Sequence, residues 1–259
     1  MDEKLIVVAN SLYDAQKNLE TIAPPTDLFP NMSFKDAYQI QGYITRKRLQ
    51  EGRRIVGRKI GATSSAMQKL FNLKEPDYGV LFDDLVFSNG STIERNKMIQ
   101  PMIEAEIGFL LKKDLPGPCV TGAQVIQACE GVVPCLEIID SRIKDWKIKI
   151  QDTIADNASC WGVVSGPKIS RPLDLDYRVL GLALYKNNTL VGTGAGAAVL
   201  GDPLVSVAWL ANKLHEYGEM LKAGDLVLSG SFMAAVTIEK GDQIRALFDR
   251  IGEVTVSIS

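Results

Sequence analysis

Apolar residues near the start of the chain recur with the 3.6-residue period of an amphipathic helix. The residues that follow this period are Leu5, Val8, Ala9, Leu12, Ala15 and Leu19. Pro24 and Pro25 then interrupt the pattern. A second helix is predicted to begin at Ser33, whose hydroxyl can cap it together with Asp36, and to end near Gly52. Residues 1–53 are therefore predicted to form a helical segment.

From residue 54 onward the apolar runs become short and are separated by turn signals such as Asn89-Gly90, which is typical of strands. Strands are predicted over residues 55–60, 79–87, 103–111, 132–139, 180–185, 226–230, 235–238, 244–248 and 254–258. Short helices are predicted at about 65–71, 121–129 and 204–217. The pattern predicts an α+β protein whose mostly antiparallel strands form a rolled or barrel-like sheet. Because no linker is visible, we expect the β-rich body, residues 54–259, to form one continuous unit with the helical segment.

Two glutamates, Glu104 and Glu106, interrupt the apolar run 99–111, and Glu137 stands in a second apolar run, 132–139. Residues two apart point to the same face of a strand. A buried carboxylate loses its hydration and is tolerated when it is paired or binds a metal. A strand with one solvated face would also show alternating glutamates, but the incomplete alternation and the isolation of Glu137 favour a functional cluster. Ligation by oxygen alone suits Mg²⁺ or Mn²⁺.

Charge and composition exclude several classes of protein. The formal net charge of −2 and the pI near 5.6 give no electrostatic basis for binding nucleic acid or an anionic membrane surface. No apolar stretch approaches the roughly 20 residues that span a bilayer, and the start of the chain lacks a signal-peptide pattern, so we expect a cytoplasmic protein. The single histidine, His215, excludes a multi-histidine metal site and is predicted to lie on the polar face of a helix.

Two further polar residues have ambiguous surroundings. Lys59 lies in a strand flanked by glycines, where burial would lower its pKa unless a carboxylate holds it charged. An exposed lysine at a sheet edge fits this segment equally well. Asp77 lies in or beside a predicted turn, where aspartate commonly serves the backbone, so a structural role is favoured from the segment alone.

Two other segments are rich in small residues. The run 152–160 carries Asp156 and Ser159, as in a loop shaped around a ligand. The glycine-rich stretch 192–201 does not fit a dinucleotide fingerprint, because the next helix begins after Asp202-Pro203 rather than within the glycines. A backbone that lines a small ligand closely is the better interpretation of these glycines.

Several segments together carry a family resemblance: residues 57–64, 75–81, 100–106, 136–142, 145–159 and 192–201. In this order, over nearly the whole chain, they resemble the 2-keto-4-pentenoate (2-hydroxypenta-2,4-dienoate) hydratases and the related 4-oxalocrotonate decarboxylases of the fumarylacetoacetate hydrolase superfamily. The resemblance implies a mixed β-roll and a Mg²⁺ or Mn²⁺ ion held by Glu104, Glu106 and Glu137. It also implies a small 2-oxo or 2-hydroxy dienoate substrate, a role in the meta-cleavage degradation of aromatic compounds, and a homo-oligomer.

The same resemblance implies roles for the other candidate residues. Lys59 would be a proton shuttle or a carboxylate anchor near the metal, and Asp77 would act in the hydration step. Ser159 and the glycines around Gly194 would line the substrate pocket. Asp156 would order its loop or a metal-bound water.

The resemblance leaves the reaction open. Residues 76–79 and 145–151 look like those of the hydratases, whereas residues 229–236 are similar to the decarboxylases, and Trp161 is bulkier than expected for the family. We favour the hydratase. A third alternative is a non-catalytic partner subunit, because family hydratases and decarboxylases can associate. Retention of the three glutamates and Lys59 argues against it, since buried anions cost stability.

Overall fold

Three helices precede the strands in the computed structural model, which describes residues 2–64, 68–69 and 73–259. They are α1 (Glu3–Asn18), α2 (Pro25–Leu28) and α3 (Phe34–Gln50). The predicted cap of the second long helix is confirmed, because the Ser33 side chain accepts from Asp36 N and the Asp36 carboxylate accepts from Ser33 N. Gly52 follows this helix with φ +86°, a left-handed conformation that favours glycine.

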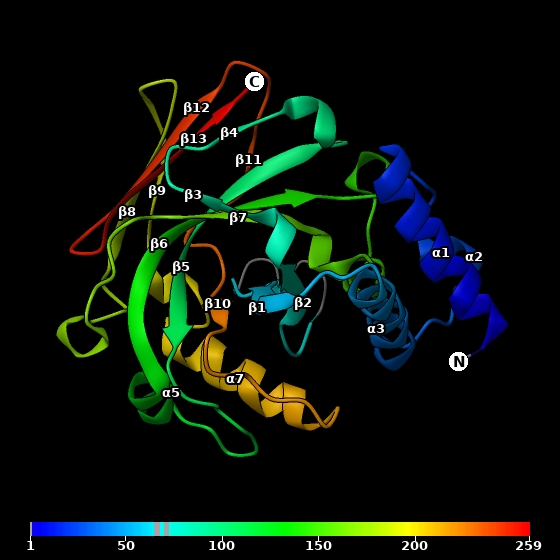
Figure 1. The fold of residues 1–259 in the computed structure, drawn as a ribbon, viewed down its shortest axis with the longest axis horizontal. Coiled ribbons are helices and arrows are strands. Elements are labelled where there is room, and N and C mark those ends of the chain that lie inside the picture. Colours follow the sequence, from blue (N-terminus) through cyan, green and yellow to red (C-terminus); the bar gives the residue numbers. More distant parts are fainter. Residues whose placement is uncertain (1, 65–67, 70–72) are drawn as a thin grey trace.

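A large, curved sheet forms the centre of the molecule, and β5 and β6 run through its middle (Figure 1). Its strands are β1 (Ile55–Gly61), β2 (Asp77–Phe82), β3 (Val86–Ser88), β5 (Pro101–Leu111), β6 (Cys129–Asp140), β7 (Cys160–Ser165), β10 (Leu226–Leu228) and β11 (Val236–Thr237). They are ordered β2-β1-β10-β5-β6-β7-β3, and β11 pairs with β5. The β1–β10 and β3–β7 pairs are parallel, and the other pairs are antiparallel.

A second, five-stranded sheet contains β4 (Thr92–Ile93), β8 (Gly181–Lys186), β9 (Thr189–Ala195), β12 (Gln243–Phe248) and β13 (Gly252–Ile258). The remaining α-helices of the described residues are α5 (Gly122–Ala128), α6 (Ile150–Ala155) and α7 (Pro203–His215). In Figure 1 the helices α1 to α3 lie at one side of the large sheet, and α5 and α7 lie below it. The predicted α+β class is confirmed.

The buried side chain of Gln41 ties α3 to the strands. Its amide donates to the carbonyls of Tyr78 on β2 (2.8 Å) and Ile154 on α6 (3.0 Å). A buried amide that satisfies two main-chain carbonyls fixes the distance between the elements that carry them. The helical segment therefore holds β2 and α6 beside each other, and both elements lead into the cavity described below.

Several element predictions were incomplete. The strands β7 and β9 and the helix α6 were not predicted, and the run 79–87 is divided by a 3₁₀ turn, Asp83–Leu85, into β2 and β3. Most of the helix predicted at 65–71 lies outside the described residues. The β9 sequence, Thr-Leu-Val-Gly-Thr-Gly-Ala, contains two glycines that weaken its strand pattern, and its pairing with β8 holds it extended.

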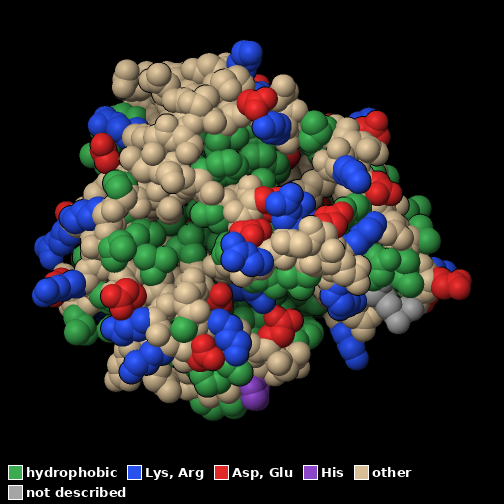
Figure 2. All heavy atoms as spheres, viewed as in Figure 1, with side chains coloured by type: hydrophobic (Ala, Val, Ile, Leu, Met, Phe, Trp, Pro, Cys, Tyr) green, Lys and Arg blue, Asp and Glu red, His purple; other side chains and the backbone are tan. Residues whose placement is uncertain are grey.

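The surface mixes charges of both signs. Figure 2 shows Lys and Arg side chains scattered among Asp and Glu on the face it displays, with hydrophobic patches between them. Within the described part of the chain, no helix has the length and apolar character needed to cross a membrane. His215 is exposed at the end of α7, as predicted, and the four cysteines are free.

Candidate metal centre and cavity

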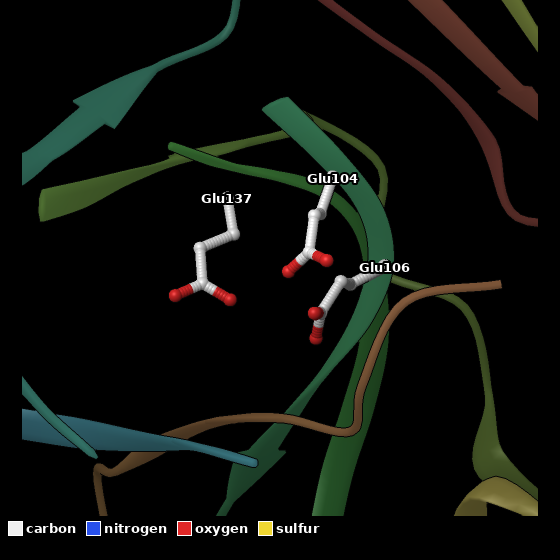
Figure 3. A group of neighbouring side chains, drawn as sticks. All are labelled: Glu104, Glu106 and Glu137. Carbon is white, nitrogen blue, oxygen red and sulfur yellow. The ribbon is translucent and has the colours of Figure 1, made fainter. Parts of the chain in front are cut away.

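The three glutamates converge in the middle of the large sheet. Glu104 on β5 lies directly opposite Glu137 on β6, and Glu106 lies opposite Cys135. One carboxylate oxygen from each of the three glutamates lies within 4.8 Å of the others. Figure 3 shows the three carboxylates pointing toward one another from the two strands. Strand register therefore produces the cluster that the sequence pattern predicted.

The electrostatics of the cluster fit a cation. Glu106 and Glu137 are fully buried, and Glu104 is half-buried at the cavity. Burial and then the neighbouring carboxylates raise the pKa of Glu106, and burial raises the pKa of Glu104 to about 7. Gly230 N donates to Glu106 Oε2 (2.7 Å), but Glu106 Oε1 has no hydrogen-bond donor among the described residues. Buried carboxylate oxygens without donors are the ligands that a divalent ion requires.

Lys59 is buried beside this cluster, which rules out an exposed lysine at a sheet edge. Its Nζ lies 3.2 Å from Glu137 Oε1 and donates to the carbonyl of Ala158 at 3.1 Å. Burial by itself lowers the lysine pKa, but Glu137, Glu104 and Asp77 outweigh it and raise the pKa above its ordinary value. The ammonium therefore stays charged, and it offsets one of the three negative charges.

Asp77 begins β2 rather than lying in a turn, and its side chain reaches the cavity. It pairs in register with Gly61 on β1, where an added Cβ would lie 2.3 Å from Asp77 Oδ1. A side chain at position 61 would displace this carboxyl group. Neither Asp77 oxygen has a hydrogen-bond partner among the described residues, and burial raises its pKa although Lys59 lowers it. Asp77 is thus a buried, unpaired acid that faces the cavity.

A left-handed turn closes the same end of the cavity. Asn157, Ala158 and Ser159 have φ values of 56°, 51° and 53°. Such values are uncommon for residues other than glycine and mark local strain. The Asn157 side chain stabilises the turn, since its Oδ1 accepts from Val80 N (2.8 Å) and its Nδ2 donates to Val80 O (3.0 Å). This clasp was not predicted, although asparagine tolerates the left-handed region well.

The turn presents two groups to the site. The Ala158 carbonyl accepts from Lys59, and Ser159 lines the cavity, with a buried hydroxyl that has no partner among the described residues. Ser159 therefore lies where the resemblance placed it, although its contact with a substrate stays a prediction. Gly79 allows the turn to approach β2, because an added Cβ there would lie 2.4 Å from Asn157 O.

Two predicted pocket residues do not line the cavity. Asp156 is buried in an ion pair with Arg142, whose Nε lies 2.5 Å from Asp156 Oδ1 and whose main-chain N donates to Oδ2 at 3.0 Å. Its position fits the ordering of the loop rather than contact with a substrate. Gly194 packs behind the cavity wall, since an added Cβ would lie 2.3 Å from the carbonyl oxygen of Phe232. Arg142, the partner of Asp156, was missed because no local pattern reveals a distant ion pair.

The cavity has a volume of about 600 Å³. Its polar end contains Lys59, Asp77, Glu104 and Ser159. The rest of the wall is mainly hydrophobic, with the side chains of Met102, Ile139, Trp146, Ile148, Ile150 and Met233. One charged end and one apolar end are typical of a site for a small organic acid.

Residues 54–259 match the family model described as fumarylacetoacetate (FAA) hydrolase C-terminal. The chain belongs to the fumarylacetoacetate hydrolase family. The predicted family resemblance is confirmed. A 2-hydroxyhexa-2,4-dienoate hydratase of Comamonas testosteroni is 43% identical over 250 residues, which cover 96% of this chain and 95% of that protein. A 2-keto-4-pentenoate hydratase of Paraburkholderia xenovorans is 46% identical over 246 residues, with coverage of 95% and 91%.

A solved structure of this family matches the whole fold. The 4-oxalocrotonate decarboxylase from Pseudomonas putida G7, complexed with magnesium and adipate, has a TM-score of 0.97 and 38% identity. The match covers 100% of this chain and 98% of that chain, which confirms the fumarylacetoacetate hydrolase-like fold. Together with the carboxylate cluster, these findings support a divalent metal site and a small-molecule substrate.

Proposed function

We propose that this protein is a divalent-metal-dependent hydratase that adds water to 2-hydroxypenta-2,4-dienoate and forms 4-hydroxy-2-oxopentanoate. The hydratases and decarboxylases that it resembles are all lyases, and this protein is a lyase. A meta-cleavage pathway for aromatic compounds would supply the substrate. The observation that carries the hydratase assignment is Asp77, a buried acid without a partner among the described residues, on the cavity wall that also holds Glu104 and Lys59.

The metal would be held by Glu104, Glu106 and Glu137, and we propose Mg²⁺ or Mn²⁺ because all the ligands are carboxylate oxygens. A bound ion would supply Lewis acidity toward the carboxylate and 2-oxygen of the substrate. Lys59 stays charged between Glu137 and the Ala158 carbonyl, so it cannot act as a base in this state. Its role would be to orient Glu137 and to favour negative charge on the substrate oxygens.

Asp77 is suited to move protons in both chemical steps. Ketonisation removes the proton of the 2-hydroxyl group and places a proton on C5. Hydration then breaks one O–H bond of water, forms the C4–O bond and places a proton on C3. Because its pKa is raised, Asp77 can donate the proton to C5 in the first step and, as the resulting carboxylate, accept one from water in the second. Solvent would accept the 2-hydroxyl proton and supply the proton on C3, so that Asp77 ends each cycle protonated.

Turnover of freshly generated 2-hydroxypenta-2,4-dienoate, followed by ultraviolet absorbance, tests this proposal. We expect loss of the dienol and formation of 4-hydroxy-2-oxopentanoate with Mg²⁺ or Mn²⁺, and no turnover with EDTA. A parallel assay with 2-oxo-3-hexenedioate provides the control. Release of CO₂ from that substrate, without hydration of the first, would overturn the hydratase assignment.

The second candidate function is that of a 4-oxalocrotonate decarboxylase. It is favoured by the close structural likeness to the decarboxylase of Pseudomonas putida G7 and by the Ala-Ala-Val sequence at residues 234–236. Loss of CO₂ from the keto diacid would use the same carboxylates to hold the metal. A substrate with a second carboxylate would need a cationic partner away from the metal end.

We also propose that the protein forms a homo-oligomer and can associate with a related decarboxylase or hydratase. A non-catalytic partner subunit is the least favoured assignment, because it would have no reason to retain three converging carboxylates and a buried lysine. Calorimetric titration with Mg²⁺ separates the cases. Absence of binding at millimolar concentration would favour the non-catalytic subunit.

A further inference from the structure

We propose that the apolar end of the cavity makes the enzyme selective for monocarboxylic dienoates with an apolar substituent at C5 and makes it discriminate against dicarboxylic ones. This inference rests on the proposed function, since it places the substrate carboxylate at the glutamate cluster. It is carried by the volume of the cavity, by the side chains that line it and by the distribution of positive charge.

The strand register defines the direction of the cavity. The Met102–Ile139 pair lies two residues along β5 and β6 from the Glu104–Glu137 pair. It is on the same face of the sheet and about 7 Å away. Both residues of this second pair line the cavity. A five-carbon acid that is held by its carboxylate at Glu104 ends near Met102.

The cavity continues beyond that point to Trp146. The Trp146 indole N–H donates to the carbonyl of Gln100 at 3.1 Å, and Gln100 lies four residues, roughly 13 Å, from Glu104 along the chain. Ile148 and Ile150 line the same region. A volume of about 600 Å³ lies in the range that proteins use for ligands much larger than pentadienoate. The additional space is bounded mainly by hydrophobic side chains, and the hydroxyl of Thr153, which also lines the cavity, donates to the carbonyl of Lys149 at 3.3 Å.

Positive charge is confined to the metal end. Lys59 is the only lysine or arginine among the described residues of the cavity wall, and its ammonium already contacts Glu137. The undescribed positions 65–67 and 70–72 contain no lysine or arginine in the sequence. The indole N–H of Trp146 is occupied by Gln100 O, so it is not free to bind an anion.

The segment around Trp146 separates apolar from charged side chains. Trp146, Ile148 and Ile150 line the cavity, whereas Lys147 and Lys149, which alternate with them, are exposed. Lys147 lies 3.5 Å from Asp145 in an exposed ion pair. A second carboxylate at this end would therefore lose its hydration without gaining a cationic partner in the wall.

Calorimetric binding of unreactive 2-oxo acids to the Mg²⁺-loaded enzyme tests the inference. The series is 2-oxopentanoate, 2-oxohexanoate, 2-oxoheptanoate and 2-oxoadipate. We expect the affinity to rise about fourfold with each added methylene, as burial of a methylene predicts. We expect 2-oxoadipate to bind roughly tenfold or more weakly than 2-oxohexanoate.

A charge introduced at the apolar end provides the converse test. Met102→Lys, with Met102→Gln as a polar control without charge, should improve the binding of 2-oxoadipate relative to 2-oxohexanoate by roughly tenfold. Ile148→Lys tests the same idea in the loop before α6 if Met102→Lys does not fold. A flat series, or equal binding of 2-oxoadipate and 2-oxohexanoate by the unmodified enzyme, would overturn this inference alone. No binding of any 2-oxo acid would overturn the proposed function as well.

Discussion

The two walls of the polar end of the cavity are built in different ways. The glutamate wall uses the regular register of two long antiparallel strands, β5 and β6, so that Glu104 faces Glu137 across one ladder. The other wall uses the left-handed turn 157–159, of which Ala158 and Ser159 line the cavity and Asn157 bonds the main chain of Val80. Lys59 joins the two walls, since it contacts both Glu137 and the Ala158 carbonyl. The regular strands thus position the glutamates, and the left-handed turn positions the lysine that faces them.

The largest expected effect comes from removing a carboxylate from the glutamate wall. Glu137→Gln removes one of three converging charges, so Mg²⁺ affinity should fall more than about 100-fold and turnover should be lost. Calorimetric titration with Mg²⁺ measures the first effect. Glu130→Gln is the matched control, because Glu130 lies on the same strand and is exposed. Equal metal affinity for the Glu137 variant and the control would remove Glu137 from the metal site.

Asp77 separates the chemistry from metal binding. Asp77→Asn keeps the shape of the side chain but cannot exchange the proton, so turnover should fall by about 10²- to 10⁴-fold. Mg²⁺ affinity should stay within a few-fold, since Asp77 is not one of the converging glutamates. Single-turnover absorbance measurements with saturating metal check both steps. Near-normal turnover in this variant would remove Asp77 from the mechanism.

The contribution of the left-handed turn 157–159 can be tested by removing the two hydrogen bonds that Asn157 makes with Val80. Asn157→Ala loses two hydrogen bonds to Val80, so the free energy of unfolding should fall by about 2 kcal/mol. Turnover should fall by roughly 10- to 100-fold while Mg²⁺ affinity changes little, because Lys59 and Ser159 lose their positions but the glutamates do not. Urea unfolding and steady-state kinetics measure these effects.

Asn188→Ala provides the control for Asn157→Ala, because Asn188 is also left-handed (φ 63°) but lies in an exposed hairpin turn. It should change stability to a similar or smaller extent and leave turnover unaffected. If both asparagine variants reduced turnover equally, the Asn157–Val80 hydrogen bonds would not be responsible for positioning Lys59 and Ser159.

The smallest expected effect is a pH dependence of the Mg²⁺ affinity of the glutamate wall. In the metal-free protein the pKa of Glu104 is raised to about 7, so a proton must leave before metal binds. Mg²⁺ affinity should therefore decrease up to about tenfold for each pH unit below 7. Calorimetry at pH 6, 7 and 8 checks this, and an affinity that does not change with pH would contradict it.

The same shift predicts how the metal-free protein responds to pH. Between the ordinary value of 4.5 and about 7, folded Glu104 holds a proton that the unfolded chain has released. The free energy of unfolding should therefore decrease as the pH rises through this window. Urea unfolding in EDTA measures it, and saturating Mg²⁺ should remove the trend, because the ion replaces the proton.

Local patterns in the sequence were sufficient for much of the fold. The 3.6-residue period located α1 and α3, and the Ser33–Asp36 pair located a helix start, because such signals act within one or two turns of chain. The spacing of Glu104 and Glu106 placed them on one face of β5, since strand side chains alternate. The strand β7 was missed, because one of its partners, the parallel strand β3, lies far away in the chain. The strand β9 was missed although its partner β8 precedes it directly in a hairpin, because its two glycines interrupt the strand pattern.

The sequence by itself determined the α+β class, the apolar strands and the three glutamates of the carboxylate cluster, since all of these depend on periodicity and residue type. The tertiary structure decided which residues share the site. Lys59 is charged and pairs with Glu137, whereas Asp156 pairs with Arg142 outside the cavity. Gly194 packs against the Phe232 main chain rather than lining the cavity. The carboxyl group of Asp77 occupies the space that a side chain at position 61 would fill. These outcomes depend on distances between segments far apart in the chain, and a local pattern carries no information about such distances.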